Sequence, residues 1–303
     1  MSKSPRRPLT AYVFLAPAML LFIAFLALPI VYAIYLSLRT VKVKGLGLGK
    51  GAREEVWAGL SNYTRALGDP ELASSLLRIG AYGLLVVPAM LGLALLFALL
   101  LDSPRTSVKG FTRLSIFLPY AVPAVISSLL WGFLYLPSVS PFHSLADKAG
   151  QVLPNPLSSG LIIYAIANIA VWGGVGFNMI VIYTALKAIP TDIYEAAKLD
   201  GCSEIAIAWR IKVPIVMPSL IMTFVFSLIA TLQVFAEPTT LRPLTNNISS
   251  TWTPLMKVYR DAFTRNDLHS AAATSVILAL ATFVLSFGFL RLVQNRAFSQ
   301  EGR

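Results

Sequence analysis

The chain has 303 residues, of which 56% are hydrophobic and only 13% are charged. Soluble domains carry about a quarter charged residues, so this composition excludes an ordinary soluble protein and indicates a polytopic membrane protein. The net charge is +11. In a membrane protein, Lys and Arg at the ends of the spans contact anionic lipid and fix the orientation, so the positive charge does not indicate a nucleic-acid partner, and we expect none. The single cysteine, Cys202, excludes an internal disulfide framework and gives no metal cluster.

The first predicted span covers residues 11–38, after a cytoplasmic N-terminus of residues 1–10. No charge interrupts the run, and a membrane helix tolerates its Pro17 and Pro29 better than a soluble helix would. A cleaved signal peptide is the alternative, because basic residues precede the run. The run is too long for a signal peptide, and no small-residue cleavage site follows its core.

Residues 39–75 are predicted to form a polar, glycine-rich extracytoplasmic loop. Part of it superficially suggests a phosphate-binding loop. A Walker A sequence needs Gly, four residues and then Gly-Lys-Ser/Thr, whereas here Lys44 takes the first glycine position and Gly51 replaces the Ser/Thr. The dinucleotide fingerprint fails as well, because Lys50 stands at its third glycine position. The segment is therefore interpreted as a loop without a nucleotide site.

Five further uncharged runs follow along the chain. They cover residues 79–101, 114–136, 160–186, 213–236 and 270–290, with extracytoplasmic loops at 137–159 and 237–269 and a cytoplasmic tail at 291–303. All six runs exceed the roughly 18 residues that a membrane helix needs, and they lack the alternation of barrel strands. The predicted fold is all-α: a polytopic bundle of six transmembrane helices in a single domain of about 75–292.

The distribution of basic residues favours a cytoplasmic N-terminus only weakly. With that orientation, the inner segments hold slightly more Lys and Arg than the outer loops. The first outer loop breaks the positive-inside tendency, so charge alone does not decide the topology.

A polar segment at 190–212 separates the fourth and fifth spans. Proline and aspartate at its start suit the first turn of a helix, which we predict over 192–199. Gly201 then ends this helix, because glycine is the usual residue where the chain turns with positive φ. Ser203 caps a second predicted helix over 204–212. The expected structure is two short helices joined by a sharp turn at the membrane surface.

On pattern alone, an amphipathic helix lying in the membrane interface explains this segment about as well as a docking surface for another protein. Its spacing, however, resembles the EAA loop of binding-protein-dependent ABC importer permeases: Glu-Ala-Ala, three residues, Gly, nine residues, Ile, one residue, an aliphatic residue and Pro. The residues that carry the resemblance are Glu195, Ala196, Ala197, Asp200, Gly201, Ile211 and Pro214. The only departure is Val213, where leucine is usual.

Other motifs are similar to those of maltose/lactose-type sugar permeases. They are Ala11–Pro17, Phe117–Tyr120, Trp172–Met179, Ile189-Pro190 and Gln233–Pro238. The resemblance implies a prokaryotic plasma (inner) membrane protein with both termini in the cytoplasm. It also implies a heterodimer with a second homologous permease, an ABC ATPase dimer seated on the EAA loop, and an extracytoplasmic solute-binding protein. The chain would then be no enzyme and bind no cofactor, since ATP and Mg²⁺ would be used by the partner ATPase.

Polar side chains inside membrane spans are costly in lipid, so we expect them to face a cavity or another helix. The candidates for a substrate path are Trp172, Asn178, Gln233 and Glu237. Trp172 offers an aromatic face and Gln233 an amide, both of which suit a sugar. Hydrogen bonding between helices is the alternative, and it is favoured for Asn168. The glycines at 173, 174 and 176 are expected to serve close helix packing or a hinge.

The predicted function is thus that of an importer permease for a sugar or oligosaccharide, with glycerol phosphate or a polyol as the alternative solute. A stand-alone secondary transporter or channel is less favoured, because ion coupling calls for charged residues in mid-span and the six runs have none. A membrane enzyme is disfavoured as well, because His143 and His269 fall in outer loops without metal-binding spacing.

Overall fold

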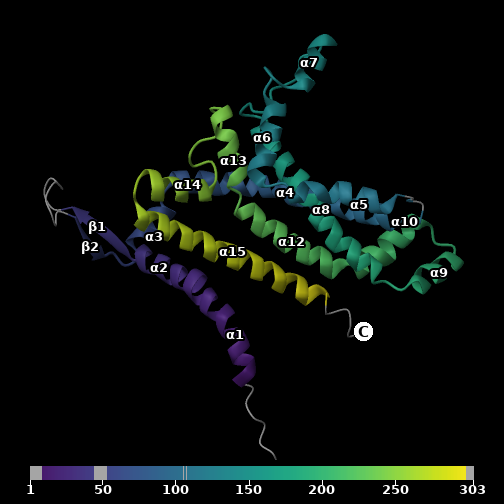
Figure 1. Ribbon diagram of the computed structural model, residues 1–303, viewed down its shortest axis with the longest axis horizontal. Helices are drawn as coiled ribbons and strands as arrows, with labels where there is room; N and C mark the ends of the chain where they lie inside the picture. The colour runs from purple at the N-terminus through teal and green to yellow at the C-terminus, as the bar shows by residue number, and fades with distance from the viewer. Residues whose placement is uncertain (1–8, 44–52, 105, 107, 298–303) are drawn as a thin grey trace, which may run out of the picture. The chain divides into compact units, whose positions relative to one another are not determined.

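Helices dominate the computed structural model (Figure 1). It describes residues 9–43, 53–104, 106 and 108–297. The predictions for the N-terminus at 1–8, the glycine-rich stretch at 44–51 and the end of the tail at 298–303 lie outside these residues. The helical content confirms the predicted all-α class, to which the described residues add one antiparallel strand pair.

The chain divides into two compact units, which are described separately. One unit comprises Met1–Pro70 with Val258–Leu280, and the other comprises Glu71–Lys257 with Ala281–Arg303. Helix α15 (Leu268–Ala297) contributes to both units.

The first unit begins with a long helix that corresponds to the first predicted span. It consists of α1 (Leu9–Phe22), a π-helical turn (Ile23–Ala27) and α2 (Leu28–Ser37). Pro29 lies just after the π-helical turn, and a proline cannot donate the backbone hydrogen bond that a regular helix needs at its position. The helix nevertheless runs without a break, as a membrane helix with internal prolines does.

The predicted loop at 39–75 contains regular structure that the sequence did not reveal. Strand β1 (Arg39–Val43) pairs antiparallel with β2 (Arg53–Trp57), and helix α3 (Ser61–Leu67) follows. The buried Asn62 holds α3 to the end of α2, since its Nδ2 donates to the carbonyls of Ser37 and Arg39 at 2.8 and 2.7 Å.

The second unit carries most of the remaining helices. They are α4 (Pro70–Asp102), α5 (Lys109–Phe117), the 3₁₀ turn η2 (Leu118–Ala121), α6 (Ala124–Tyr135), α7 (Pro141–Lys148), α8 (Ile162–Lys187), α9 (Thr191–Leu199), α10 (Glu204–Ile207), the π-helical turn η3 (Ala208–Lys212), α11 (Val213–Ile215), α12 (Met217–Leu232), α13 (Ala236–Leu241), the 3₁₀ turn η4 (Arg242–Leu244) and α14 (Pro254–Tyr259). The last two residues of α14 and the π-helical turn η5 (Arg260–Thr264) belong to the first unit. The buried core follows α4 and α8, around Tyr82 and Ile166 in one cluster and Ala94 and Met179 in the other.

Five described helical segments are long and apolar enough to cross a membrane: Tyr12–Ser37, Pro70–Asp102, Ile162–Lys187, Met217–Leu244 and Leu268–Arg291. The sixth candidate is a bent pair, Lys109–Ala121 with Ala124–Tyr135, whose parts meet at 99°. The sequence predicted one continuous helix over 114–136. The bend arises at Pro123, because a proline disfavours helical geometry in the preceding residue, and Val122 is indeed extended with φ −82° and ψ 124°.

The fifth predicted span, 213–236, is also interrupted. Helix α12 ends at Leu232, and the chain resumes helical geometry only at Ala236, where α13 begins. In Figure 1 α12 leads from the end of the unit that carries α9 and α10 to the end that carries α13. The interruption lies beside the pocket described next.

Candidate functional site

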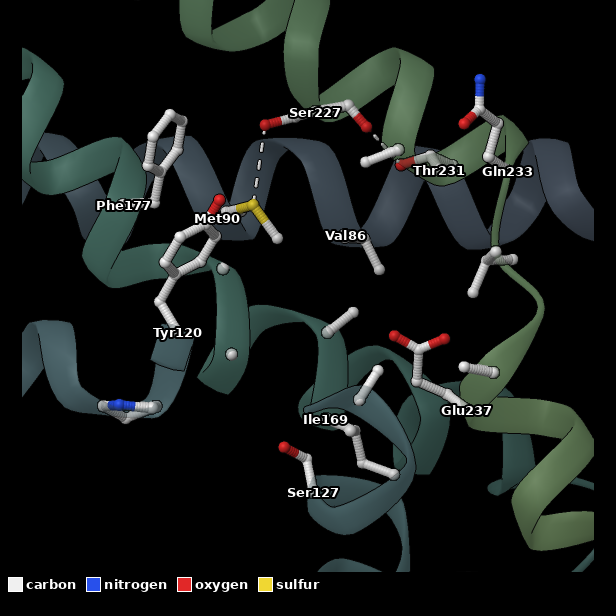
Figure 2. A pocket seen from close by; sticks show the side chains of 18 of the residues that line it. Val86, Met90, Tyr120, Ser127, Ile169, Phe177, Ser227, Thr231, Gln233 and Glu237 are labelled. Atoms are coloured by element: carbon white, nitrogen blue, oxygen red, sulfur yellow. Dashed lines mark hydrogen bonds between the residues drawn. The ribbon is translucent and has the colours of Figure 1, made fainter. Parts of the chain in front are cut away.

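A pocket of about 900 Å³ lies among the helices of the second unit. Its walls come from α4, α8, α12, α13 and the bend between η2 and α6 (Figure 2). Residues from these elements include Tyr82, Val86, Met90, Tyr120, Ser127, Ile169, Phe177, Asn178, Ser227, Thr231, Gln233 and Glu237. The broken helices thus build the pocket, because the bend at Pro123 and the interruption after Leu232 both open onto it.

The pocket wall is mostly apolar, with a few polar groups. Among the described residues that line it, Glu237 is the only one with a charged side chain, and Figure 2 shows its carboxylate directed into the pocket. Hydroxyl groups come from Ser127, Ser227 and Thr231, and an exposed amide comes from Gln233. Such a site offers hydrogen bonds and apolar contact to a solute but no positive charge.

An aromatic pair forms part of this wall. The rings of Tyr120 and Phe177 stack with their centroids 5.0 Å apart and their planes at 21°. Neither residue was predicted as a site residue. Tyr120 lies in the motif Phe117–Tyr120, next to Pro119, and Phe177 lies in the motif Trp172–Met179, so membership of these two motifs was the signal that pointed to them.

Three of the four predicted path residues line this pocket: Asn178, Gln233 and Glu237. Asn178 is buried; its Nδ2 donates to the Gly174 carbonyl at 3.0 Å, while its Oδ1 has no hydrogen-bond partner in the described part of the chain. An unpaired buried acceptor is costly, so water or a solute hydroxyl would stabilise it.

The fourth predicted residue, Trp172, lies elsewhere. Its ring packs edge-on against Trp131, with centroids 5.9 Å apart and an angle of 78° between planes. Asn168 donates to the Tyr135 hydroxyl at 2.8 Å, in agreement with the interpretation as a contact between helices. Trp172 is therefore a packing residue in this structure and not a pocket residue.

The glycines of α8 differ in what surrounds them. A Cβ added at Gly176 would come 2.3 Å from the Ile116 carbonyl oxygen and 2.7 Å from the Cα of Phe117. Both are backbone atoms, which cannot move aside cheaply, so α8 crosses α5 at a distance that only glycine permits. At Gly173 an added Cβ would meet nothing within 4 Å. The close-packing interpretation is thus confirmed for Gly176.

The segment between α8 and α12 folds as the sequence predicted. Helix α9 ends before Gly201, which has φ +78°, and the Ser203 Oγ accepts the Ala206 N–H at 3.3 Å to cap α10. The second predicted helix, 204–212, consists of α10 and the π-helical turn η3. An exposed ion pair between Lys198 and Glu204, at 3.0 Å, spans the turn.

The surface of this segment combines charged and apolar side chains. Glu195, Ala196, Asp200 and Gly201 are exposed, whereas Ala197 is buried. Three large apolar residues are also exposed beside them: Leu199, Ile205 and Trp209, at 90, 73 and 63%. Exposed apolar side chains gathered in this way are typical of a surface that another protein or the membrane covers.

Known proteins match this chain over most of the pocket and over the α9–α10 segment. The sequence matches the family described as binding-protein-dependent transport system inner membrane component over residues 90–299. Among curated proteins, the sn-glycerol-3-phosphate transport system permease protein UgpA of Agrobacterium fabrum is 28% identical over 289 residues, which is 94% of each chain. The protein of the same name from Escherichia coli O157:H7 is 27% identical with the same coverage.

The fold has solved counterparts. A chain of a bacterial ABC transporter involved in the import of the acidic polysaccharide alginate superposes with a TM-score of 0.80 and 19% identity, covering 96% of both chains. A second structure, of the alginate transporter in complex with an alginate pentasaccharide-bound periplasmic protein, gives 0.78. Because the family match spans more than half of the chain and includes most of the pocket and the whole α9–α10 segment, the chain belongs to the binding-protein-dependent transport system inner membrane components.

Proposed function

We propose that this permease forms half of the transmembrane pathway of an ATP-driven importer for an uncharged carbohydrate. The observation that carries the proposal is the continuity between two features. The exposed α9–α10 segment bears the EAA motif, and the helices on both of its sides, α8 and α12, line the pocket. A partner that moved this segment would act on the pocket walls.

The partner in this proposal is a dimer of a cytoplasmic ABC ATPase. Glu195 and Asp200 offer charge, Ala196 and Gly201 allow close backbone approach, and Leu199 offers apolar area to a groove on the ATPase. ATP and Mg²⁺ are used by that partner. Ile211 and Pro214 lie on the path from the docking surface into α12.

The assembly contains a second, homologous permease, with which this chain encloses the pathway, and an extracytoplasmic binding protein that delivers the solute. Both termini and the α9–α10 segment face the cytoplasm of a prokaryotic cell, in its inner membrane. The family assignment and the alginate transporter structure with its periplasmic protein support this arrangement.

The chemistry of the pocket favours a neutral solute over an anionic one. A phosphate or uronate entering a mostly apolar pocket needs a cation, because desolvating an unpaired ion costs several kcal/mol. The described lining offers no Lys, Arg or His and does carry the Glu237 carboxylate. A neutral sugar instead finds amide, hydroxyl and aromatic partners, among them Gln233 and the Tyr120–Phe177 pair.

The solute class is tested on the assembled complex, purified through a tag on this chain and supplied with its binding protein. ATP hydrolysis is measured with maltose, glycerol and sn-glycerol-3-phosphate in turn. Stimulation by the neutral sugar and none by the phosphate is the expected result. Stimulation by sn-glycerol-3-phosphate alone would assign the chain to the same solute as the UgpA proteins and contradict the uncharged-solute proposal.

A further inference from the structure

A buried cluster of charges joins the α9–α10 segment to the pocket-lining helices. The Asp102 carboxylate, at the end of α4, accepts from Lys212 Nζ at 2.6 Å and from Lys187 Nζ at 2.8 Å. Lys187 is the last residue of α8, and Lys212 is the last residue of η3. The side chains of Asp102 and Lys212 are only 5 and 9% exposed, whereas that of Lys187 is 48% exposed.

Helix α9 reaches the same cluster through an aromatic ring. The Lys212 ammonium lies over the ring of Tyr194, 4.8 Å from its centroid. Burial raises the pKa of the Tyr194 hydroxyl to about 12, with a smaller contribution from the negative charge of Asp102, so the ring stays neutral. One carboxylate thus contacts the last residue of α8, which precedes this segment, and the last residue of η3, and it reaches α9 through Lys212.

The position of Asp102 opposes the local rule for helices. A helix C-terminus carries a partial negative charge and favours a cation, so aspartate as the final residue of α4 is unfavourable there by itself. The two lysines offset that cost only when the end of α8 and the end of η3 both lie against Asp102. Departures from local preference that are compensated from distant segments are typical of functional positions.

The three elements that meet at Asp102 continue into the pocket walls. Helix α4 supplies Met90 to the pocket, 12 residues or about 18 Å along the helix from Asp102. Helix α8 supplies Asn178, and η3 leads through α11 into α12, which supplies Ser227. In Figure 2 Met90 and Ser227 meet across the pocket, with the Ser227 Oγ donating to the Met90 sulfur at 3.6 Å.

We infer that Asp102 is the junction at which movement of the α9–α10 segment is transmitted to the pocket-lining helices α4, α8 and α12. The ion pairs keep the three helix ends together while the segment moves, so the pocket walls change position with it. Asp102, Lys187 and Lys212 are positioning residues: they touch neither solute nor nucleotide. The inference rests on the proposed function, because it concerns how an ATPase bound to α9–α10 would act on the pocket.

The test measures how many solute molecules are imported per ATP hydrolysed, in vesicles that contain the complete complex. Asp102→Asn and Lys212→Met remove one charge each from the junction. We expect the complex to assemble and to hydrolyse ATP, with the ratio lowered by about tenfold, within the usual range of coupling between sites. Lys212→Arg, which keeps charge and N–H donors, is expected to restore the ratio. The matched control is Arg113→Met, which removes an exposed cation from helix α5.

A purely structural role predicts a different pattern, in which uptake and hydrolysis fall together and the ratio stays constant. That result would overturn the inference. If burial of Asp102 and Lys212 prevents the first two variants from assembling, Lys187→Met decides, since its half-exposed side chain leaves no buried cavity; an unchanged ratio in that variant overturns the inference as well. Failure of the unsubstituted complex to import solute with ATP would instead refute the proposed function.

Discussion

Gly176 shows how one residue fixes the distance between two helices of the second unit. An added Cβ would meet the backbone of residues 116 and 117, which belongs to the helix that α8 crosses. We predict that Gly176→Ala destabilises the protein by about 1–3 kcal/mol, the usual cost of overpacking. Thermal unfolding in detergent measures the change.

The control for this prediction is Gly80→Ala on α4. An added Cβ there meets nothing within 4 Å, and alanine favours a helix over glycine. We expect Gly80→Ala to leave the unfolding temperature unchanged or to raise it slightly. Equal destabilisation by both substitutions would show that the close crossing at Gly176 is not the cause.

Glu237 is the residue that gives the pocket its charge. We predict that Glu237→Lys admits sn-glycerol-3-phosphate, because the ammonium supplies the counter-charge that the described lining lacks, and that it weakens the response to a neutral sugar. Stimulated ATP hydrolysis by the complex is the measurement. Asp147→Lys, an equal charge change on the exposed face of α7, should leave both responses unaltered.

At this scale the sequence singled out Asn178, Gln233 and Glu237 as substrate-path candidates, because polar groups in apolar runs seek a cavity. All three line the pocket, and their contact with a solute stays a prediction. Trp172 shows the limit of that argument. With 3.6 residues per turn, Trp172 and Asn178 lie about 120° apart on α8, so the two side chains meet different neighbours. The Trp172 ring packs against Trp131, a contact between separate helices that the local sequence pattern does not predict.

Among the elements, the α9–α10 turn depends most strongly on a single backbone conformation. Gly201 has φ +78°, which proline excludes and which costs other residues roughly 1–2 kcal/mol. We predict that Gly201→Pro uncouples solute uptake from ATP hydrolysis, so that hydrolysis continues while uptake falls and the bundle stays folded. Glu195→Lys is expected to have the same effect, because it changes the exposed docking face. Parallel assays of uptake and hydrolysis test this.

Gly201→Ala should give a milder loss, because an added Cβ at this position meets nothing within 4 Å and only the dihedral strain remains. Gly110→Ala is the matched control, since Gly110 lies within helix α5 and an added Cβ there also meets nothing within 4 Å. Normal coupled uptake by Gly201→Pro would contradict the role assigned to the turn.

The elements themselves were predicted unevenly from the sequence. Long apolar runs and the capped α9–α10 pair were predicted correctly, because span length, Ser203 and Gly201 act locally. The 99° bend after Pro119 and Pro123 was not predicted, since membrane helices often tolerate proline. The β1–β2 hairpin was missed as well, because its strands are short and largely polar.

For the molecule as a whole, the proposed function divides the work between this chain and its partners. The pocket and the exposed segment lie in one chain, while the energy source and the other half of the pathway belong to partners in the proposed assembly. The Asp102 cluster was beyond sequence reasoning, because it joins residues 85 and 110 positions apart. Only the packing of α4 against α8 and η3 brings those charges together.

The central claim is that ATP hydrolysis in a partner drives import through this permease. It is tested by reconstituting the purified complex in vesicles, supplying the binding protein on one side and measuring uptake of a labelled neutral oligosaccharide. We predict uptake that requires both ATP on the opposite side and the binding protein, and that persists when ion gradients are collapsed. Uptake that follows an ion gradient without ATP would contradict the account.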